Sequence, residues 1–118
     1  MTAPEKARTP EDLARLWFEH ATARDADGLA SLYEAAAVLE LPGGELAGGR
    51  AAIRAYYAGF LASEPALVRG RTRKAVRKGN LALTSTRLEG GTVSAEVARR
   101  QPDGAWLWVL DAPDLTTG

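Results

Sequence analysis

The chain has 118 residues, which is enough for one domain with a single hydrophobic core. Fifteen basic and fifteen acidic side chains cancel, so the whole molecule has no net field that would attract nucleic acid or a membrane surface. It contains no cysteine and one histidine, which excludes disulfides, a cysteine nucleophile and a metal site built from several such ligands. No segment is apolar over a membrane-spanning length. We therefore expect a cytoplasmic protein that uses no metal or cofactor and binds neither nucleic acid nor membrane.

Helical patterns fill the first half of the chain. A polar, flexible arm over residues 1–9 precedes the first helix, where Thr9 suits the cap and Pro10 the first helical position. Glycine pairs separate the later elements of this half. The predicted elements are a helix from residue 10, a short helix from Asp25 or Asp27, a strand at 37–41 and a helix over 50–62.

From residue 67 onward the apolar pattern changes to a period of two, which is typical of strands. Turn sequences rich in glycine separate the strands, so consecutive strands pair as hairpins. This layout predicts an α+β fold in which a curved antiparallel sheet wraps around N-terminal helices. One domain spans residues 10–113 and a tail spans 114–118. The predicted strands are 68–76, 81–88, 92–100 and 105–111.

Five stretches of the chain carry a family resemblance: Asp25-Ala-Asp-Gly28, Leu32-Tyr33, Glu40-Leu-Pro42, Gly49-Arg-Ala-Ala-Ile-Arg-Ala-Tyr-Tyr57 and Arg99-Arg-Gln-Pro-Asp-Gly-Ala-Trp106. Together the chain resembles the superfamily of nuclear transport factor 2, ketosteroid isomerase and polyketide-cyclase-like proteins. The resemblance covers residues 13–111 and implies a cone of cystatin-like topology whose apolar interior is a small-molecule site. That superfamily hosts isomerases, cyclases, hydrolases, dehydratases and plain binding domains, so the resemblance leaves the reaction open.

The resemblance also allows the isomerase machinery to be carried over residue by residue. The general base falls at Leu41, which cannot accept a proton, and the oxyanion-donating tyrosine falls at Trp17. The supporting tyrosines correspond to Tyr33 and Tyr57, and the protonated acid of the oxyanion hole falls near Glu96. The resemblance therefore implies a retained cavity without the usual base, and it argues against steroid isomerisation by that mechanism.

The candidate acid–base pair is Glu96 and Asp111. If Asp103-Gly104 forms a two-residue turn, these acids are cross-strand neighbours on one face of the last hairpin. A carboxylate pair in an apolar cone raises one pKa and yields an acid–base couple. A turn one residue longer separates the two acids. In the competing interpretation Asp111 only ends the strand and Glu96 pairs with an arginine.

Strict alternation along the last strand places Leu107, Val109 and Asp111 on the face that covers the helices. His20 lies on the stripe of the first helix, where it is either a base or a structural histidine near the rim of the cone. We expect the cone to be lined by Trp17, Tyr33, Leu41, Tyr56, Tyr57, Phe60 and Val109.

A run of basic residues over 69–78 has no interleaved aromatics. We interpret it as a solvated strand face whose charges pair with acids of the same chain or of a dimer partner. Both faces of the last strand are apolar, which predicts a homodimer through the open face of the sheet.

These patterns predict a protein that binds an apolar or partly polar small molecule. As an enzyme it would be an isomerase, cyclase or dehydratase that uses Asp111 and Glu96. The alternative is a non-catalytic module for ligand binding or dimerisation. Acids bonded to arginines, or a closed pocket, would favour that alternative.

Overall fold

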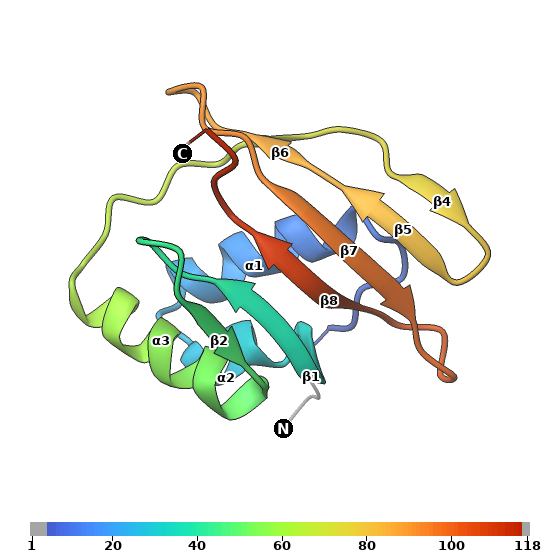
Figure 1. Cartoon of the computed structure of the whole chain (residues 1–118), viewed down its shortest axis with the longest axis horizontal. Helices are drawn as coiled ribbons and strands as arrows, with labels where there is room; N and C mark the ends of the chain where they lie inside the picture. Colours follow the sequence, from blue (N-terminus) through green and yellow to red (C-terminus); the bar gives the residue numbers. More distant parts are fainter. Residues whose placement is uncertain (1–4, 117–118) are drawn as a thin grey trace.

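A computed structural model describes residues 5–116 of the chain. Helices precede most of the strands, as the periodicity predicts (Figure 1). The helices are α1 (Asp12–Thr22), α2 (Ala26–Ala30) and α3 (Arg50–Ala62). The strands are β1 (Tyr33–Glu40), β2 (Leu46–Gly48), β3 (Arg71–Thr72), β4 (Val76–Lys78), β5 (Leu81–Thr84), β6 (Thr86–Arg87), β7 (Ala95–Arg100) and β8 (Trp106–Ala112).

Six strands form a curved, unclosed sheet in the order β2-β1-β8-β7-β5-β4, and the helices lie together on one side of it (Figure 1). The expected α+β class is confirmed. The sheet is mainly antiparallel, but β1 and β8 pair in parallel, which the antiparallel prediction did not include. Strands β3 and β6 form a separate two-stranded ribbon.

The helix starts follow the local sequence signals. The backbone N–H of Asp12 donates to the hydroxyl of Thr9, and the Asp12 carboxylate accepts from the backbone N–H of Thr9. The carboxylate of Asp25 caps α2 by accepting from the N–H of Gly28 at 2.9 Å. Helix α3 covers the predicted range and begins after Gly49, whose φ of 92° favours glycine.

The N-terminal segment differs from the prediction of a flexible arm over residues 1–9. Ala7 is buried, and its carbonyl accepts from the backbone N–H of Trp106 at 3.0 Å. Lys6 forms an ion pair with Asp103 at 2.8 Å. Residues 5–9 are therefore held against the start of β8, because the edge of the hairpin offers them a hydrogen bond and an apolar surface. The remainder of the predicted arm lies outside the described residues.

Two of the long strands predicted from the sequence are interrupted. The range 68–76 contains β3 and the start of β4, and 81–88 contains β5 and β6. The break in the first falls at Ala75, whose backbone N–H donates to the carboxylate of Glu11 at the start of α1. Because this hydrogen bond occupies the N–H of Ala75, that group cannot pair with a neighbouring strand. The chain before Ala75 leaves the main sheet. The β3–β6 ribbon is the result.

The last hairpin contains a β-bulge that decides which side chains point inward. Gln101 and Ala105 close a three-residue loop, one residue longer than predicted. Ala98 then pairs with Trp108, whereas Val97 pairs with Leu110, so β8 has one extra residue at this point. The bulge shifts the register by one residue and restores the pairing of the two acids beyond it. The predicted neighbours are therefore correct, although the turn that was meant to produce them is not.

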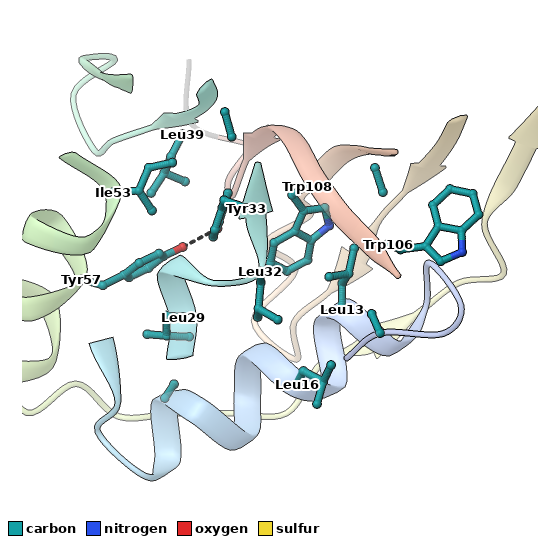
Figure 2. Close-up of a cluster of buried hydrophobic side chains, with 14 of the residues drawn as sticks. Leu13, Leu16, Leu29, Leu32, Tyr33, Leu39, Ile53, Tyr57, Trp106 and Trp108 are labelled. Carbon is teal, nitrogen blue, oxygen red and sulfur yellow. Dashed lines mark hydrogen bonds between the residues drawn. The ribbon is translucent and has the colours of Figure 1, made fainter. Parts of the chain in front are cut away.

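The core lies between the helices and the inner face of the sheet (Figure 2). Trp106 and Trp108 of β8 are buried, contrary to the expectation that Leu107 and Val109 share the inward face. Tyr33, at the start of β1, is fully buried and hydrogen-bonded to Tyr57 of α3, as Figure 2 shows. The hydrogen-bonded hydroxyl groups of Tyr33 and Tyr57 therefore lie within the hydrophobic core.

Candidate functional site

A cavity of about 380 Å³ opens between α1, the β3–β6 ribbon and the inner face of β7 and β8. Its floor combines aromatic rings with two carboxyl groups, and its outer wall is the segment that leads into β3. The lining residues are Glu11, Ala14, Arg15, Trp17, Phe18, Tyr57, Val68, Arg69, Gly70, Thr72, Thr86, Leu88, Ser94, Glu96, Trp108, Asp111 and Pro113.

Glu96 and Asp111 lie side by side in the floor of this cavity. They are cross-strand partners in β7 and β8, and their exposed fractions are 6% and 8%. Thr84 of the neighbouring strand donates its hydroxyl to Glu96 Oε1 at 2.7 Å. Among the described residues neither acid forms an ion pair. The interpretation in which Glu96 pairs with an arginine is therefore wrong.

The only described side chain that donates to Asp111 is Tyr33, from its hydroxyl to Oδ2 at 2.5 Å. Because that bond uses the Tyr33 proton, Tyr33 must accept the proton of Tyr57 in the 2.6 Å contact between the two hydroxyls. Tyr57 in turn accepts from the indole N–H of Trp17 at 3.1 Å. Every donor in this series of hydrogen bonds therefore points toward Asp111. Oδ1 of Asp111 is left without a protein partner among the described residues.

Burial raises the pKa of Asp111 to about 7, and the neighbouring charge of Glu96 adds to the effect. The hydrogen bond from Tyr33 opposes this rise by stabilising the ionised form. Burial also raises the pKa of Glu96. Among the described residues no cation pairs with Asp111 to offset this rise in its pKa.

Tyr33 and Tyr57, the two tyrosines of this series of hydrogen bonds, remain protonated donors. Burial raises the pKa of Tyr33 well above its ordinary value, and the charge of Asp111 adds to this. Burial likewise raises the pKa of Tyr57. The network therefore stays fixed while Asp111 changes its protonation state. When Asp111 is protonated, Oδ2 already accepts from Tyr33, so the proton is placed on Oδ1.

His20 lies outside the cavity lining. Its Nδ1 is 3.6 Å from the carboxylate of Asp25, and its Nε2 is buried without a described partner. A Cβ atom at Gly28 would lie 2.3 Å from His20 Nδ1, so the imidazole packs directly against the start of α2. This placement favours the structural interpretation of His20 over a base at the rim.

The predicted lining is correct in part. Trp17 and Tyr57 line the cavity, while Tyr33 lies beneath it and reaches it only through Asp111. Four other predicted residues are absent from the lining. Leu41, Tyr56 and Phe60 pack against the core outside the cavity. Val109 is the extra residue of β8 at the bulge.

Sequence reasoning missed several lining residues. Trp108 lies on the face that the predicted alternation assigns to the outside, but the three-residue loop places it opposite Ala98 and inward together with Trp106. Phe18 lies beside the apolar stripe of α1, and the guanidinium of Arg69 stacks on its ring at 4.7 Å. Thr72 and Thr86 join the lining because the ribbon folds over α1, and no local pattern signals that packing.

Within residues 5–116, no group of three or more potential metal ligands is found. None of the helices in this range has both the length and the apolar character needed to cross a membrane.

The curved sheet, the helices on its inner side and the cavity between them define the cystatin-like, nuclear transport factor 2-like fold. Residues 14–114 match the family described as the SnoaL-like domain. The chain belongs to this family, and the expected resemblance is confirmed. A comparison with curated proteins found no match.

Solved structures with the same fold share little sequence with the chain. A ketosteroid isomerase-like protein from Erwinia carotovora atroseptica is 16% identical with a TM-score of 0.69, covering 86% of this chain and 88% of its own. A candidate dehydratase of the NTF2-like family from Streptomyces avermitilis is 19% identical with a TM-score of 0.68, covering 89% and 94%. An NTF2-like protein of unknown function from Pseudomonas putida is 20% identical with a TM-score of 0.67, covering 90% and 86%. These similarities establish the fold and leave the activity open.

Proposed function

We propose that this protein binds an apolar or partly polar small molecule in the cavity above Asp111 and catalyses proton transfer on it without a cofactor. The observation that carries this proposal is a pair of buried carboxyl groups, Glu96 and Asp111, in the wall of an open cavity and without an ion pair among the described residues. Among the described residues Asp111 accepts from the side chain of Tyr33 alone, whereas a carboxyl group kept there for structure alone would be expected to have a cation or several donors.

The chemistry follows from the free oxygen of Asp111. Tyr33 fixes Oδ2, so Oδ1 is the atom that takes or gives a proton. A pKa of about 7 suits both roles at neutral pH, because neither the acid nor the base form is then scarce. The hydroxyl and indole donors behind Asp111 hold its orientation in both states.

Glu96 is proposed as the second acid of the pair. Burial raises its pKa, and the hydroxyl of Thr84 holds Oε1 in place. Two neighbouring carboxyl groups resist joint ionisation, so one of them donates while the other accepts. An isomerase, cyclase or dehydratase step needs this combination, since a proton leaves one atom of the substrate and a proton is delivered to another.

Proton exchange into deuterated water tests this proposal without knowledge of the product. A panel of small cyclic ketones and β-hydroxy ketones is incubated with the protein, and loss of the signal next to the carbonyl group is followed by NMR. We expect exchange on at least one member, with an activity midpoint near pH 7, and loss of exchange in Asp111→Asn. Asp103→Asn is the matched control, because Asp103 is exposed and far from the cavity lining.

Binding without exchange would instead support the non-catalytic ligand-binding module. In that case Asp111→Asn changes affinity for the neutral apolar dye N-phenyl-1-naphthylamine, while no panel member exchanges faster than in buffer. Failure of the dye to bind would refute the cavity as a ligand site.

We further propose homodimerisation through the outer face of the sheet. A row of apolar side chains crosses five strands on that face, each residue being the cross-strand partner of the next: Val76, Leu83, Val97, Leu110 and Val38. Val76, Leu83 and Leu110 are each at least 50% exposed in the single chain. A continuous apolar row of this kind favours a second copy of the sheet as its cover.

A further inference from the structure

The β3–β6 ribbon presents arginines on its outer side. Thr72 and Thr86 face the cavity, and their hydroxyls lie 2.9 Å apart. Arg71 and Arg87 are direct partners in the same ribbon, so alternation places them together on the opposite side. Arg69 precedes Arg71 by two residues and lies at the cavity rim. These three exposed residues, which we call the arginine row (Arg69, Arg71 and Arg87), lie at the rim and on the outer side of the ribbon.

The arginine row has no acidic partner among the described residues. None of the ion pairs in that part of the chain involves Arg69, Arg71 or Arg87. The one contact of Arg69 is with the ring of Phe18. For Arg69 and Arg71 the expected ion pairs with acids of the same chain are not found among the described residues, and pairing with acids of a dimer partner stays a prediction. The second cation of the cavity lining, Arg15, is by contrast bound to Glu5, Asp12 and Glu19.

This arrangement opposes the formation of the ribbon. Like charges directly opposite each other destabilise a strand pair. The ribbon consists of two residue pairs only, and so short a ribbon has little stability of its own. Gly70 allows a very close approach here, since a Cβ atom would lie 2.9 Å from the carbonyl oxygen of Arg87. A polyanion that bridges the two guanidinium groups would remove this repulsion and hold the outer wall of the cavity in place.

We propose that the arginine row binds the phosphate groups of a ligand whose apolar head occupies the cavity. The substrate class is thus a small apolar molecule carried on a phosphate-bearing tail, an inference that rests on the proposed function. Phosphate fits better than a single carboxylate, because guanidinium groups bind it in bidentate fashion and one carboxylate would leave most of the row's charge unpaired.

Two probes separate the head from the tail. Inorganic pyrophosphate represents the tail, and its affinity is measured by calorimetry. N-phenyl-1-naphthylamine is neutral and represents the head, and its affinity is measured by fluorescence. The test variant is Arg71→Gln with Arg87→Gln, which removes two charges from the ribbon. The control variant is Lys78→Gln with Arg100→Gln, which removes two exposed charges without an ion pair among the described residues. Lys78 is the last residue of β4 and Arg100 the last residue of β7 (Figure 1).

We expect the test variant to bind pyrophosphate at least about tenfold more weakly than the parent, because each lost guanidinium removes charge-assisted hydrogen bonds. The control variant should stay within about twofold, a change that general screening explains. Without pyrophosphate, dye affinity should not fall in either variant. Pyrophosphate should increase dye affinity in the parent and in the control variant but not in the test variant, since both ligands favour the closed ribbon.

Other outcomes refute the proposal in distinguishable ways. Equal pyrophosphate affinity in the test and control variants, with normal dye binding, overturns the arginine row and leaves the cavity site intact. Loss of dye binding in the parent overturns the proposed function itself. A test variant that changes only the sedimentation coefficient would assign the arginines to acids of a partner chain. A single-stranded RNA that displaces pyrophosphate at equal phosphate concentration would overturn the small-ligand class.

Folding of the test variant is not at risk from the charge removal, because the substitution relieves the repulsion between Arg71 and Arg87. Arg71→Lys with Arg87→Lys provides a second measurement. Lysine keeps the charge but lacks the planar fork, so pyrophosphate affinity should fall between the parent and the glutamine variant. An affinity of the lysine variant below that of the glutamine variant would contradict the proposal.

Discussion

Replacing Asp111 by asparagine should make the protein more stable at neutral pH. Burial places the pKa of Asp111 at about 7, compared with the ordinary aspartate pKa of 3.8 that applies to the unfolded chain. Between these two pKa values the folded protein holds a proton that the unfolded chain has released, so the free energy of unfolding falls as pH rises. Stability from this group is complete below about pH 4 and is lost by about pH 7.

The size of the effect follows from the displacement of the pKa. Each pH unit corresponds to about 1.4 kcal/mol, so full ionisation of Asp111 costs the folded state on the order of 4 kcal/mol. Asparagine has nearly the same shape, and its amide oxygen can accept the hydrogen bond from Tyr33 that Oδ2 accepts now. The variant should match the parent at about pH 4 and exceed it at about pH 8 by as much as that cost.

Urea unfolding of both proteins across this pH range measures the difference. Asp103→Asn is the control of opposite sign: the hydrogen bond from Lys6 lowers the pKa of Asp103, so its stabilising contribution is present at neutral pH and lost in acid. An Asp111→Asn protein that is less stable than the parent at about pH 8, or that keeps the parent's pH slope, would refute the assignment of Asp111 as a strained, proton-exchanging group.

Four further substitutions test the hydrogen bonds, the outer face and the helix packing. Tyr57→Phe removes the acceptor of the Trp17 indole N–H and the donor to the Tyr33 hydroxyl and should cost about 1–3 kcal/mol in thermal or urea unfolding; an unchanged stability would contradict the series of hydrogen bonds. Leu110→Glu places a charge in the apolar row of the outer face, and sedimentation should show monomers where the parent is dimeric. A parent that is itself monomeric at micromolar concentration would remove the dimer proposal. Gly28→Ala forces a Cβ atom to 2.3 Å from His20 Nδ1 and should destabilise by about 1–3 kcal/mol. Gly59→Ala has no such neighbour and should stabilise α3 by about 0.5–1 kcal/mol.

The sequence by itself was sufficient for features that depend on a few neighbouring residues. Thr9 and Asp25 signal the starts of α1 and α2 because capping is a local hydrogen bond between residues three positions apart. The helix over 50–62 and the change from helical to strand periodicity are likewise local, and they define the α+β class. The sequence also named Glu96 and Asp111 as the candidate acids, but the two-residue turn used in that counting is wrong, and their pairing depends on the three-residue loop and the bulge together.

The tertiary structure decided the features that depend on packing between distant segments. The three-residue loop places Trp106 and Trp108 on the inward face of β8. The bulge beyond Trp108 brings Asp111 onto that same face in register with Glu96 and leaves Val109 outside the site. The hydrogen bonds of Tyr33 to Tyr57 and Asp111 join residues 24 and 78 positions apart, and no local pattern encodes them. The same holds for the β3–β6 ribbon, which forms where contact with the start of α1 draws the chain away from the main sheet. Local hydrogen bonding therefore placed the helix starts, whereas close packing of distant segments completed the pairing of the two acids and shaped the cavity around them.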